Sequence, residues 1–209
     1  MRRILLGLTM GLGMGLAVAP AWAQSVCKVA GLAGEVHSGA RLLKVGDGLE
    51  AGAEIRTGGD GRVRLRCVDG SSLVLGDNSH LQLTSYKAAS GAHPRAASLW
   101  LEVGVLGQTV SPGGPGSSWE VRTPSAVTAV RGTEFIVEVS AEQGTAVHVE
   151  KGEVAVESTV KTRGLVPRPP TKLNVQVNGT QCSTAGACTA ASAWSAARVQ
   201  AVQSRLGGL

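Results

Sequence analysis

Short segments of alternating apolar and polar residues, separated by glycine and aspartate turns, are the feature that most limits how this chain can fold. In the clearest segment, residues 62–68, three apolar side chains alternate with three arginines: Val63, Leu65 and Cys67, and Arg62, Arg64 and Arg66. A period of two places one set on the buried face of a strand and the other set in solvent. Asp69-Gly70 follows as a tight hairpin turn. The pattern therefore predicts a half-buried strand that enters a hairpin.

Similar turns recur about every 10 residues, and this spacing with little helical periodicity predicts an all-β fold. A sandwich, a barrel and a wound coil of β-turns all fit. The chain has 29 Gly but one Tyr and one Phe, so few aromatic side chains are available to fill a wide core. We therefore expect short strands linked by Gly/Asp turns in a solenoid-like or sandwich-like stack, and favour the wound coil. Residues 190–206 are alanine-rich, and Trp194, Ala197 and Val202 lie near helical spacing, which predicts a short C-terminal helix.

Composition divides the chain into four predicted parts. Residues 1–23 resemble an export signal, with Arg2-Arg3, an apolar run over residues 4–19 and Ala21-Trp22-Ala23 as the cleavage site. Uncleaved anchoring in a membrane is the alternative, but the run is short for a span, which needs about 20 residues. The β domain is expected over residues 24–158, a Pro/Arg-rich linker over 159–171, and a strand, cysteine loop and helix over 172–209. We expect a periplasmic or secreted protein.

The four cysteines lie after the predicted signal, at Cys27, Cys67, Cys182 and Cys188. An even number of cysteines in an exported protein indicates disulfides, and four cysteines allow three connectivities. We favour Cys27–Cys67, which would tie the N-terminal strand to a core strand, and Cys182–Cys188, which would close a small loop. Metal binding is the competing interpretation; it is weak because no Cys-x-x-Cys spacing occurs and no histidine is near the last two cysteines.

Residues 121–135 combine a strand end, a proline, a run of small residues, a glycine turn and a second strand. Pro124 cannot donate to a sheet ladder and is expected at a strand boundary, with Thr123 in extended geometry. Gly132 is expected to allow a turn or bulge that a side chain would block. Arg131 has two interpretations: it binds a partner's carboxylate, or its guanidinium ties carbonyls or Glu134 into the turn. We favour the structural one.

This stretch resembles the signature of the FecR-type domain. The resemblance rests on Arg122-Thr123-Pro124 followed by Val130-Arg131-Gly132-Thr133-Glu134-Phe135. Earlier segments also resemble the family: Gly46-Asp47 before Ile55-Arg56-Thr57, and Asp69-Gly70-Ser71 before Asn78-Ser79. Together with a hairpin over residues 147–156, the similarity covers roughly residues 29–157. It implies a domain that senses signals through protein contacts, as in membrane-anchored regulators of sigma factors.

The favoured function is an exported, non-catalytic protein-interaction or signal-sensing module of the cell envelope. Only the predicted signal precedes the domain, so we do not expect the sigma-factor segment of those regulators. The expected partner is an envelope protein, either a receptor or a regulator, and the strip formed by Arg62, Arg64 and Arg66 is a candidate contact. The competing view of this strip is a solvated strand face or a charge-guarded edge.

A glycan- or cell-wall-binding module is the alternative function. Sugars commonly stack on aromatic rings, and Trp100, Trp119 and Tyr86 are the candidates. A nucleic-acid partner is not expected, because neither a dense basic patch nor a series of aromatic platforms is evident.

The sequence does not predict catalysis, a cofactor or a metal. No Gly-x-Ser-x-Gly elbow, His-Glu-x-x-His helix or phosphate loop occurs. The histidines are scattered, at His37, His80, His93 and His148. The acids in glycine-rich turns fit turn capping better than calcium ligation: Asp47, Asp60, Asp69 and Asp77.

Overall fold

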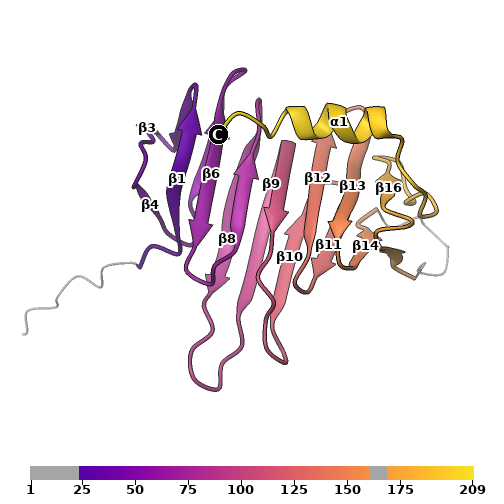
Figure 1. Cartoon of the computed structure of the whole chain (residues 1–209), viewed down its shortest axis with the longest axis horizontal. Helices are drawn as coiled ribbons and strands as arrows, with labels where there is room; N and C mark the ends of the chain where they lie inside the picture. Colours follow the sequence, from indigo (N-terminus) through magenta and orange to yellow (C-terminus); the bar gives the residue numbers. More distant parts are fainter. Residues whose placement is uncertain (1–23, 161–168) are drawn as a thin grey trace, which may run out of the picture.

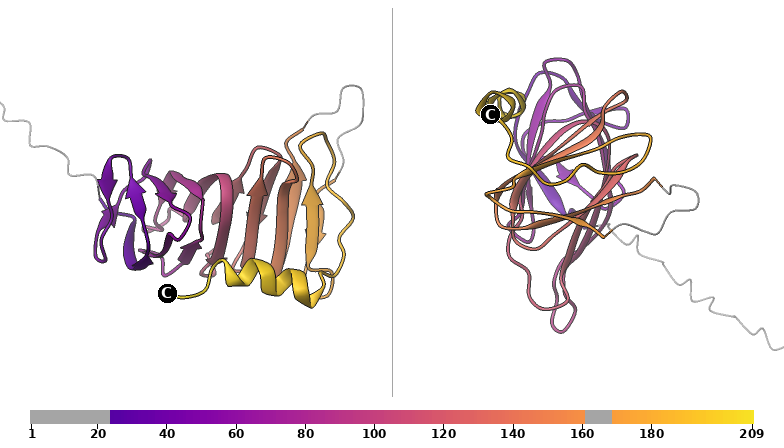
Figure 2. Two further views of the ribbon diagram at one scale, coloured as in Figure 1. Left: turned by 90° about the horizontal axis from the view of Figure 1, so that it is seen from above. Right: turned by 90° about the vertical axis from the view of Figure 1, so that its right-hand side faces the viewer.

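The computed structural model describes residues 24–160 and 169–209. The predicted signal at 1–23 and most of the predicted linker lie outside these residues. The described chain forms two facing β-sheets whose strands run across the long axis of the molecule (Figure 1). Seen along that axis in Figure 2, the two layers are flattened against each other and the helix lies outside them. The fold is thus the sandwich-like stack among the expected all-β architectures.

Sheet A and sheet B share one long strand, β9 (Ala96–Thr109). In spatial order, sheet A contains β4 (Gly48–Leu49), β1 (Cys27–Ala33), β6 (Arg62–Cys67), β7 (Ser72–Leu75), β9, β12 (Glu134–Ser140), β13 (Gly144–Lys151) and β16 (Gly179–Cys182). Sheet B contains β3 (Arg41–Leu42), β2 (Val36–Ser38), β5 (Glu54–Thr57), β8 (His80–Lys87), β9, β10 (Ser118–Arg122), β11 (Ala126–Val130), β14 (Val154–Ser158) and β15 (Thr171–Leu173).

Strand β9 changes sheets at Gly104. Its first half pairs with β8 and β10 in sheet B, and its second half pairs with β7 and β12 in sheet A. Gly104 has a φ of 103°, and a Cβ there would collide with the side chain of Ser79. Glycine is therefore required both by the backbone angle and by the close approach.

The main core lies between the inner faces of the sheets. Val63, Leu65 and Cys67 of β6 are buried, and the arginines between them face outward, as the alternation predicts. The Asp69-Gly70 turn joins β6 to β7 with Gly70 at a φ of 84°. Disulfide Cys27–Cys67 links two residues that are also paired across β1 and β6. The expected strand and its hairpin are both present.

The helix α1 (Ala196–Ser204) lies on the outer face of sheet A (Figures 1 and 2). It is shorter than the predicted segment 190–206. Ser195 is its N-cap, and the side-chain oxygen accepts a hydrogen bond from the amide of Arg198. Val202 packs on Val105 and Ile136 in a small apolar cluster that is separate from the main core. The described part of the chain has no helix long and apolar enough to cross a membrane.

Candidate functional site

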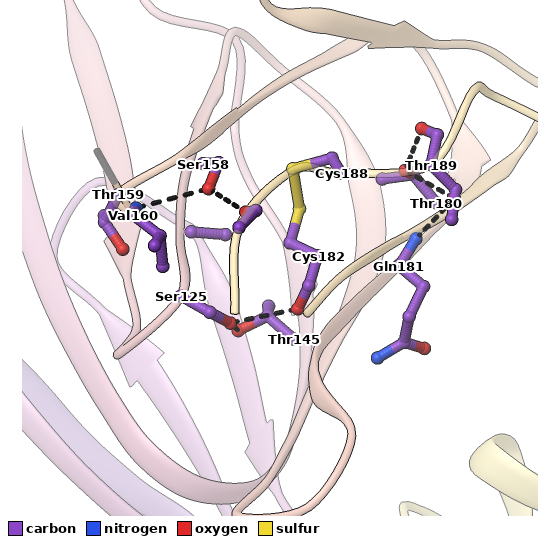
Figure 3. The surroundings of a disulfide bond; sticks show 12 residues. Ser125, Thr145, Ser158, Thr159, Val160, Thr180, Gln181, Cys182, Cys188 and Thr189 are labelled. Carbon is purple, nitrogen blue, oxygen red and sulfur yellow. Dashed lines mark hydrogen bonds between the residues drawn. A yellow bond between two sulfur atoms is a disulfide. The ribbon is translucent and has the colours of Figure 1, made fainter. Parts of the chain in front are cut away.

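The Thr123-Pro124-Ser125 turn between β10 and β11 contains a buried hydroxyl cluster, formed by Thr123, Ser125 and Thr145. The Thr145 oxygen lies 2.7 Å from both other hydroxyl oxygens. Ser125 Oγ also donates to the carbonyl of Cys182 at 3.1 Å (Figure 3). The cluster therefore ties a turn of sheet B to β13 and β16 of sheet A, and its hydroxyls are engaged inside the fold.

The Cys182–Cys188 loop is held against the same turn (Figure 3). Ser158 Oγ donates to the carbonyl of Gly186 at 2.5 Å, and Thr159 Oγ1 donates to the carbonyl of Pro124 at 2.9 Å. Both disulfides that the sequence favoured are formed. The second one stabilises the loop that leads from β16 toward α1.

Residues 130–135 carry the chain from sheet B to sheet A. Gly132 has a φ of 68°, and a Cβ on it would lie 3.1 Å from the Cα of Pro112. Phe135 enters the main core and is 1% exposed. Thr133 is also buried, and Val130 is the last residue of β11. Gly132 therefore has the turn geometry that the sequence predicts.

The two arginines of the motif are at the surface. Arg122 is exposed and donates to one oxygen of Glu120, Oε2, from Nε at 3.1 Å and from Nη2 at 2.9 Å. Arg131 is exposed, and among the described residues no hydrogen bond or ion pair joins it to Glu134 or to a carbonyl. The expected role of the Arg131 guanidinium in tying the turn is therefore not seen.

A buried ion pair lies between the sheets at Asp69 and Arg95. Arg95 Nη1 donates to Asp69 Oδ2 at 2.6 Å and to the carbonyl of Ser111 at 2.8 Å. Burial alone would raise the pKa of Asp69, but contacts with Tyr86, Ser71 and Arg95 outweigh it and lower that pKa below its usual value. Burial beside Asp69 raises the pKa of Tyr86. The sequence pattern around Arg95 did not indicate this pairing, and the acid of the Asp69-Gly70 turn was the only sign of it.

Two of the three aromatic residues proposed for sugar stacking are in the core. Trp119 is 1% exposed and Tyr86 is 6% exposed. Their rings meet edge to face with centroids 6.1 Å apart, and Trp119 Nε1 donates to Gln108 Oε1 at 2.9 Å. Only Trp100 is half-buried. Neither Trp119 nor Tyr86 can present a ring to a glycan in this structure, so the set of platforms proposed from the sequence does not assemble.

The histidines are spread over the two sheets. His37 contacts Glu35 at 2.7 Å, and His80 lies between Glu54 and Glu102 at 3.6 and 2.5 Å. Burial lowers the pKa of His148, although Glu150 acts in the opposite direction. Within residues 24–160 and 169–209, no three His, Cys, Asp or Glu side chains are placed to hold a metal ion together.

The arginine strip, formed by Arg62, Arg64 and Arg66, lies on the outer face of sheet A. Arg62 Nε donates to the carbonyl of Arg205, just after α1, at 2.9 Å. Lys28 is paired with Arg66 across β1 and β6 and is exposed. The strip therefore contacts the C-terminal end of α1 at one arginine and leaves a basic surface beside it.

The segment that covers this face, residues 194–206, is called the strap below. At its start, the Trp194 ring stacks on His148 with centroids 5.0 Å apart, and the Arg198 guanidinium lies 3.9 Å from the centre of the Trp194 ring. At its end, Arg205 Nε is 3.0 Å from Asp77 Oδ1 and Arg205 Nη1 is 2.8 Å from Glu138 Oε1. A stacked aromatic column and a two-carboxylate clamp thus hold the two ends.

Glycines on sheet A make room for the strap. Gly107 and Gly179 belong to one row of registered residues on the outer face: Arg64, Val74, Gly107, Ile136, His148 and Gly179. A Cβ on Gly179 would collide with the Trp194 indole, and one on Gly107 would lie 2.8 Å from Leu206 Cδ1. A Cβ on Gly76 would lie 2.8 Å from the carbonyl of Arg205. The row from Arg64 to Gly179 is called the outer row below. Its two glycines leave room for a segment that lies close to the sheet.

The chain is an all-β sandwich module. Its two β-sheets share strand β9, buried hydrogen bonds and an ion pair connect them, and the strap covers one outer face. Residues 53–155 match the family model described as FecR protein. The chain therefore contains a FecR-type domain. The matched range includes the β6–β7 hairpin, the Arg95 site, the hydroxyl cluster residues and β13, whereas β15, β16 and α1 follow it.

Two crystal structures of a candidate anti-sigma factor from Parabacteroides distasonis ATCC 8503, at 1.65 and 2.50 Å resolution, are similar to this chain. They are 19% and 20% identical to it, and the alignments cover 63% of this chain with a TM-score of 0.44. The match spans 60% of the length of that protein. No curated protein matches the chain.

Proposed function

We propose that this protein is an exported, non-catalytic module that binds an envelope protein and takes part in sensing a signal. The observation that carries the proposal is the match of residues 53–155 to the FecR family model, since the resemblance to that family implies a domain that senses signals through protein contacts. The signal-like residues 1–23 support export, and the two disulfides are compatible with an oxidising compartment.

The chemistry of the motif supports binding in preference to catalysis. The hydroxyls of Thr123, Ser125 and Thr145 are engaged with one another inside the fold, and the Asp69–Arg95 pair is buried. Among the accessible surfaces, the arginine strip is the clearest charged strand face. A protein partner with carboxylates is the contact that such a strip suits.

Photo-crosslinking in cells tests the proposal. A crosslinking amino acid replaces Thr109 on the outer face of sheet A, with a matched one at Thr84 of sheet B; both residues are exposed. We expect the protein in the periplasmic fraction with oxidised cysteines, and a reproducible protein adduct at position 109. Reduced cysteines in the cytoplasmic fraction, or adducts at neither site, would refute the proposal.

A further inference from the structure

The outer face of sheet A has an apolar floor that is independent of the main core. Val105 and Ile136 are 0% and 3% exposed because Val202 covers them, and with Trp194 and Leu206 they form a cluster of their own. The main core lies on the other side of the sheet and does not include the strap. Lifting the strap would therefore uncover apolar surface without opening the core.

Contact residues of the strap follow a spacing of four. Trp194, Arg198, Val202 and Leu206 meet the sheet or each other, whereas Ala197 and Ala201, on other faces, are exposed. Residues four apart lie on one side of a helix. Within α1 this places Arg198 and Val202 on one side, while Trp194 precedes the N-cap and Leu206 follows the helix. The strap as a whole therefore presents an aromatic ring at its start and aliphatic side chains toward its end, with the Arg205 guanidinium between Asp77 and Glu138.

Most of the strap's contacts are polar and lie at or near the surface: besides the Arg205 clamp, the Trp194 amide donates to Asn178 Oδ1, Arg198 Nη2 donates to Gln181 Oε1, and Arg62 Nε donates to the carbonyl of Arg205. Helix α1 has nine residues, and Val202 is its one buried side chain. Isolated helices shorter than about 12 residues are marginal in water, so α1 depends on the sheet for its structure. Its polar contacts are partly exposed: the Arg205 side chain is 30% exposed, and Gln203 meets Glu150 at the surface at 2.5 Å. A segment of another protein that has similar contact residues and buries more apolar surface would compete with the strap for sheet A.

We infer that the outer row of sheet A is the surface that receives the partner, and that the strap occupies this surface within the same chain until a partner's helix replaces it. The partner's helix would carry an aromatic residue just before its N-terminus, an aliphatic residue on its buried side with another just after its C-terminus, and a cation at its C-terminal end. Each feature matches one part of the surface: the ring meets His148 above Gly179, the aliphatic residues meet Ile136 and Gly107, and the cation meets Asp77 and Glu138. The existence of a partner rests on the proposed function.

A groove beside the strap is an initial contact site for an incoming helix. Its volume is about 280 Å³, and it is lined by Val74, Gly107, Ile136, Glu150, Gln203 and Leu206, among others. One wall is the strap itself, and the floor is the outer row. A side chain that enters this groove touches the surface that the strap covers, so binding there and release of the strap are linked.

A fluorescein-labelled peptide of residues 190–209 is the probe. In the unmodified full chain the strap already occupies the surface, which weakens the apparent affinity in proportion to the small fraction that is open. Val202→Asp places a carboxylate on the apolar floor and should open the surface. We expect this variant to bind the probe at least 10-fold more tightly than the unmodified chain in fluorescence anisotropy, whereas Ala201→Asp, on an exposed face of α1, should leave the affinity unchanged.

A second variant and a control peptide protect the test against misfolding. Arg205→Glu reverses the charge between Asp77 and Glu138 and should also increase probe binding; a peptide in which Trp194 and Leu206 are replaced by serine should not bind. Equal affinities for the unmodified chain and both strap variants, or binding of the serine peptide, would overturn the inference.

The result is independent of the search for an envelope partner. If the probe fails to bind while crosslinking at position 109 still yields a partner, the inference falls and the proposed function stands. If the probe binds as expected and no partner is found, the surface is real and the proposed function falls.

Discussion

Two arginines of this protein clamp two turn aspartates in very different surroundings. Arg95 meets Asp69 at 2.6 Å with side chains 4% and 9% exposed, between the two sheets. Arg205 meets Asp77 at 3.0 Å with side chains 30% and 19% exposed, at the end of the strap. Both aspartates belong to Gly/Asp turns that flank β7. The chemistry of the two pairs is nearly the same, and their burial is not.

Burial decides what each pair does. When one charge of a buried pair is removed, the other remains buried without water and without a counter-ion. Loss of either Asp69 or Arg95 should therefore strongly destabilise the folded protein. Water can solvate Asp77 and Glu138 if Arg205 leaves, so that clamp is reversible. Contacts with Arg205 lower the pKa of Asp77 although burial opposes them. One pair fixes the sandwich, and the other holds a segment that can be exchanged.

The largest effect is expected from Arg95→Met. The change keeps much of the side-chain volume but leaves Asp69 buried and unpaired, and we expect a loss of about 3–5 kcal/mol in the free energy of unfolding. Urea denaturation followed by circular dichroism measures it. A loss below about 1 kcal/mol would mean that water reaches Asp69 and that the contrast between the two pairs is false.

An intermediate effect is expected from Thr145→Val, which removes the hydroxyl shared by Thr123 and Ser125 at nearly constant shape. Both hydroxyls are buried and would lose a partner, and this should cost about 1–3 kcal/mol of unfolding free energy. Thr84→Val at an exposed position is the matched control, with an expected change within about 0.5 kcal/mol. Equal values for the two variants would show that the hydroxyl cluster does not stabilise the sandwich.

A small global effect is expected from Arg205→Met, since a partly exposed pair contributes about 1 kcal/mol or less. Its local effect should be large: hydrogen exchange of the amides in α1 should accelerate, while β6 and β12 keep the protection of the unmodified chain. Accelerated exchange throughout sheet A would instead make the strap part of the cooperative core.

The smallest effect is a dependence of the strap on pH through His148. Its surroundings are the Trp194 ring, Glu150, Arg198 and the backbone of Asn178. Because burial lowers the pKa of His148 in the docked state, protons bind more readily when the strap is lifted, and docking should weaken as the pH falls through the ordinary pKa of a histidine. Hydrogen exchange of α1 at pH 5.5 and pH 8, rescaled for intrinsic rates, measures this. His148→Gln should abolish the difference; a difference that persists in this variant would assign it to another group.

Much of the strand layout could be predicted, since it depends on neighbours in sequence. The alternation over residues 62–68 correctly placed Val63 and Leu65 inside, and Asp69-Gly70 forms the hairpin. Both favoured disulfides are present, and Gly132 has the expected positive φ. The resemblance of residues 122–135 to the FecR-type domain is confirmed by the family match.

Other predictions failed because they depended on which segments meet in space. No pattern near Arg95 predicted its burial, yet it lies against Asp69, which is 26 residues earlier in the chain. Trp119 and Tyr86 were considered as surface platforms, but both rings close the end of the core beside Arg95. Ala197 was counted in the buried face of the C-terminal helix, which instead is set by Trp194, Val202 and Leu206.

By itself, the sequence determined where this chain turns and which side of each strand is apolar, because glycine geometry and a period of two act over a few residues. Only the tertiary structure decided that β9 serves both sheets, that one arginine is buried against Asp69 and another remains releasable at Asp77, and that glycines of sheet A lie under the strap. Burial and partnership are properties of segments brought together from distant parts of the chain, and their energies depend on the water that this packing excludes.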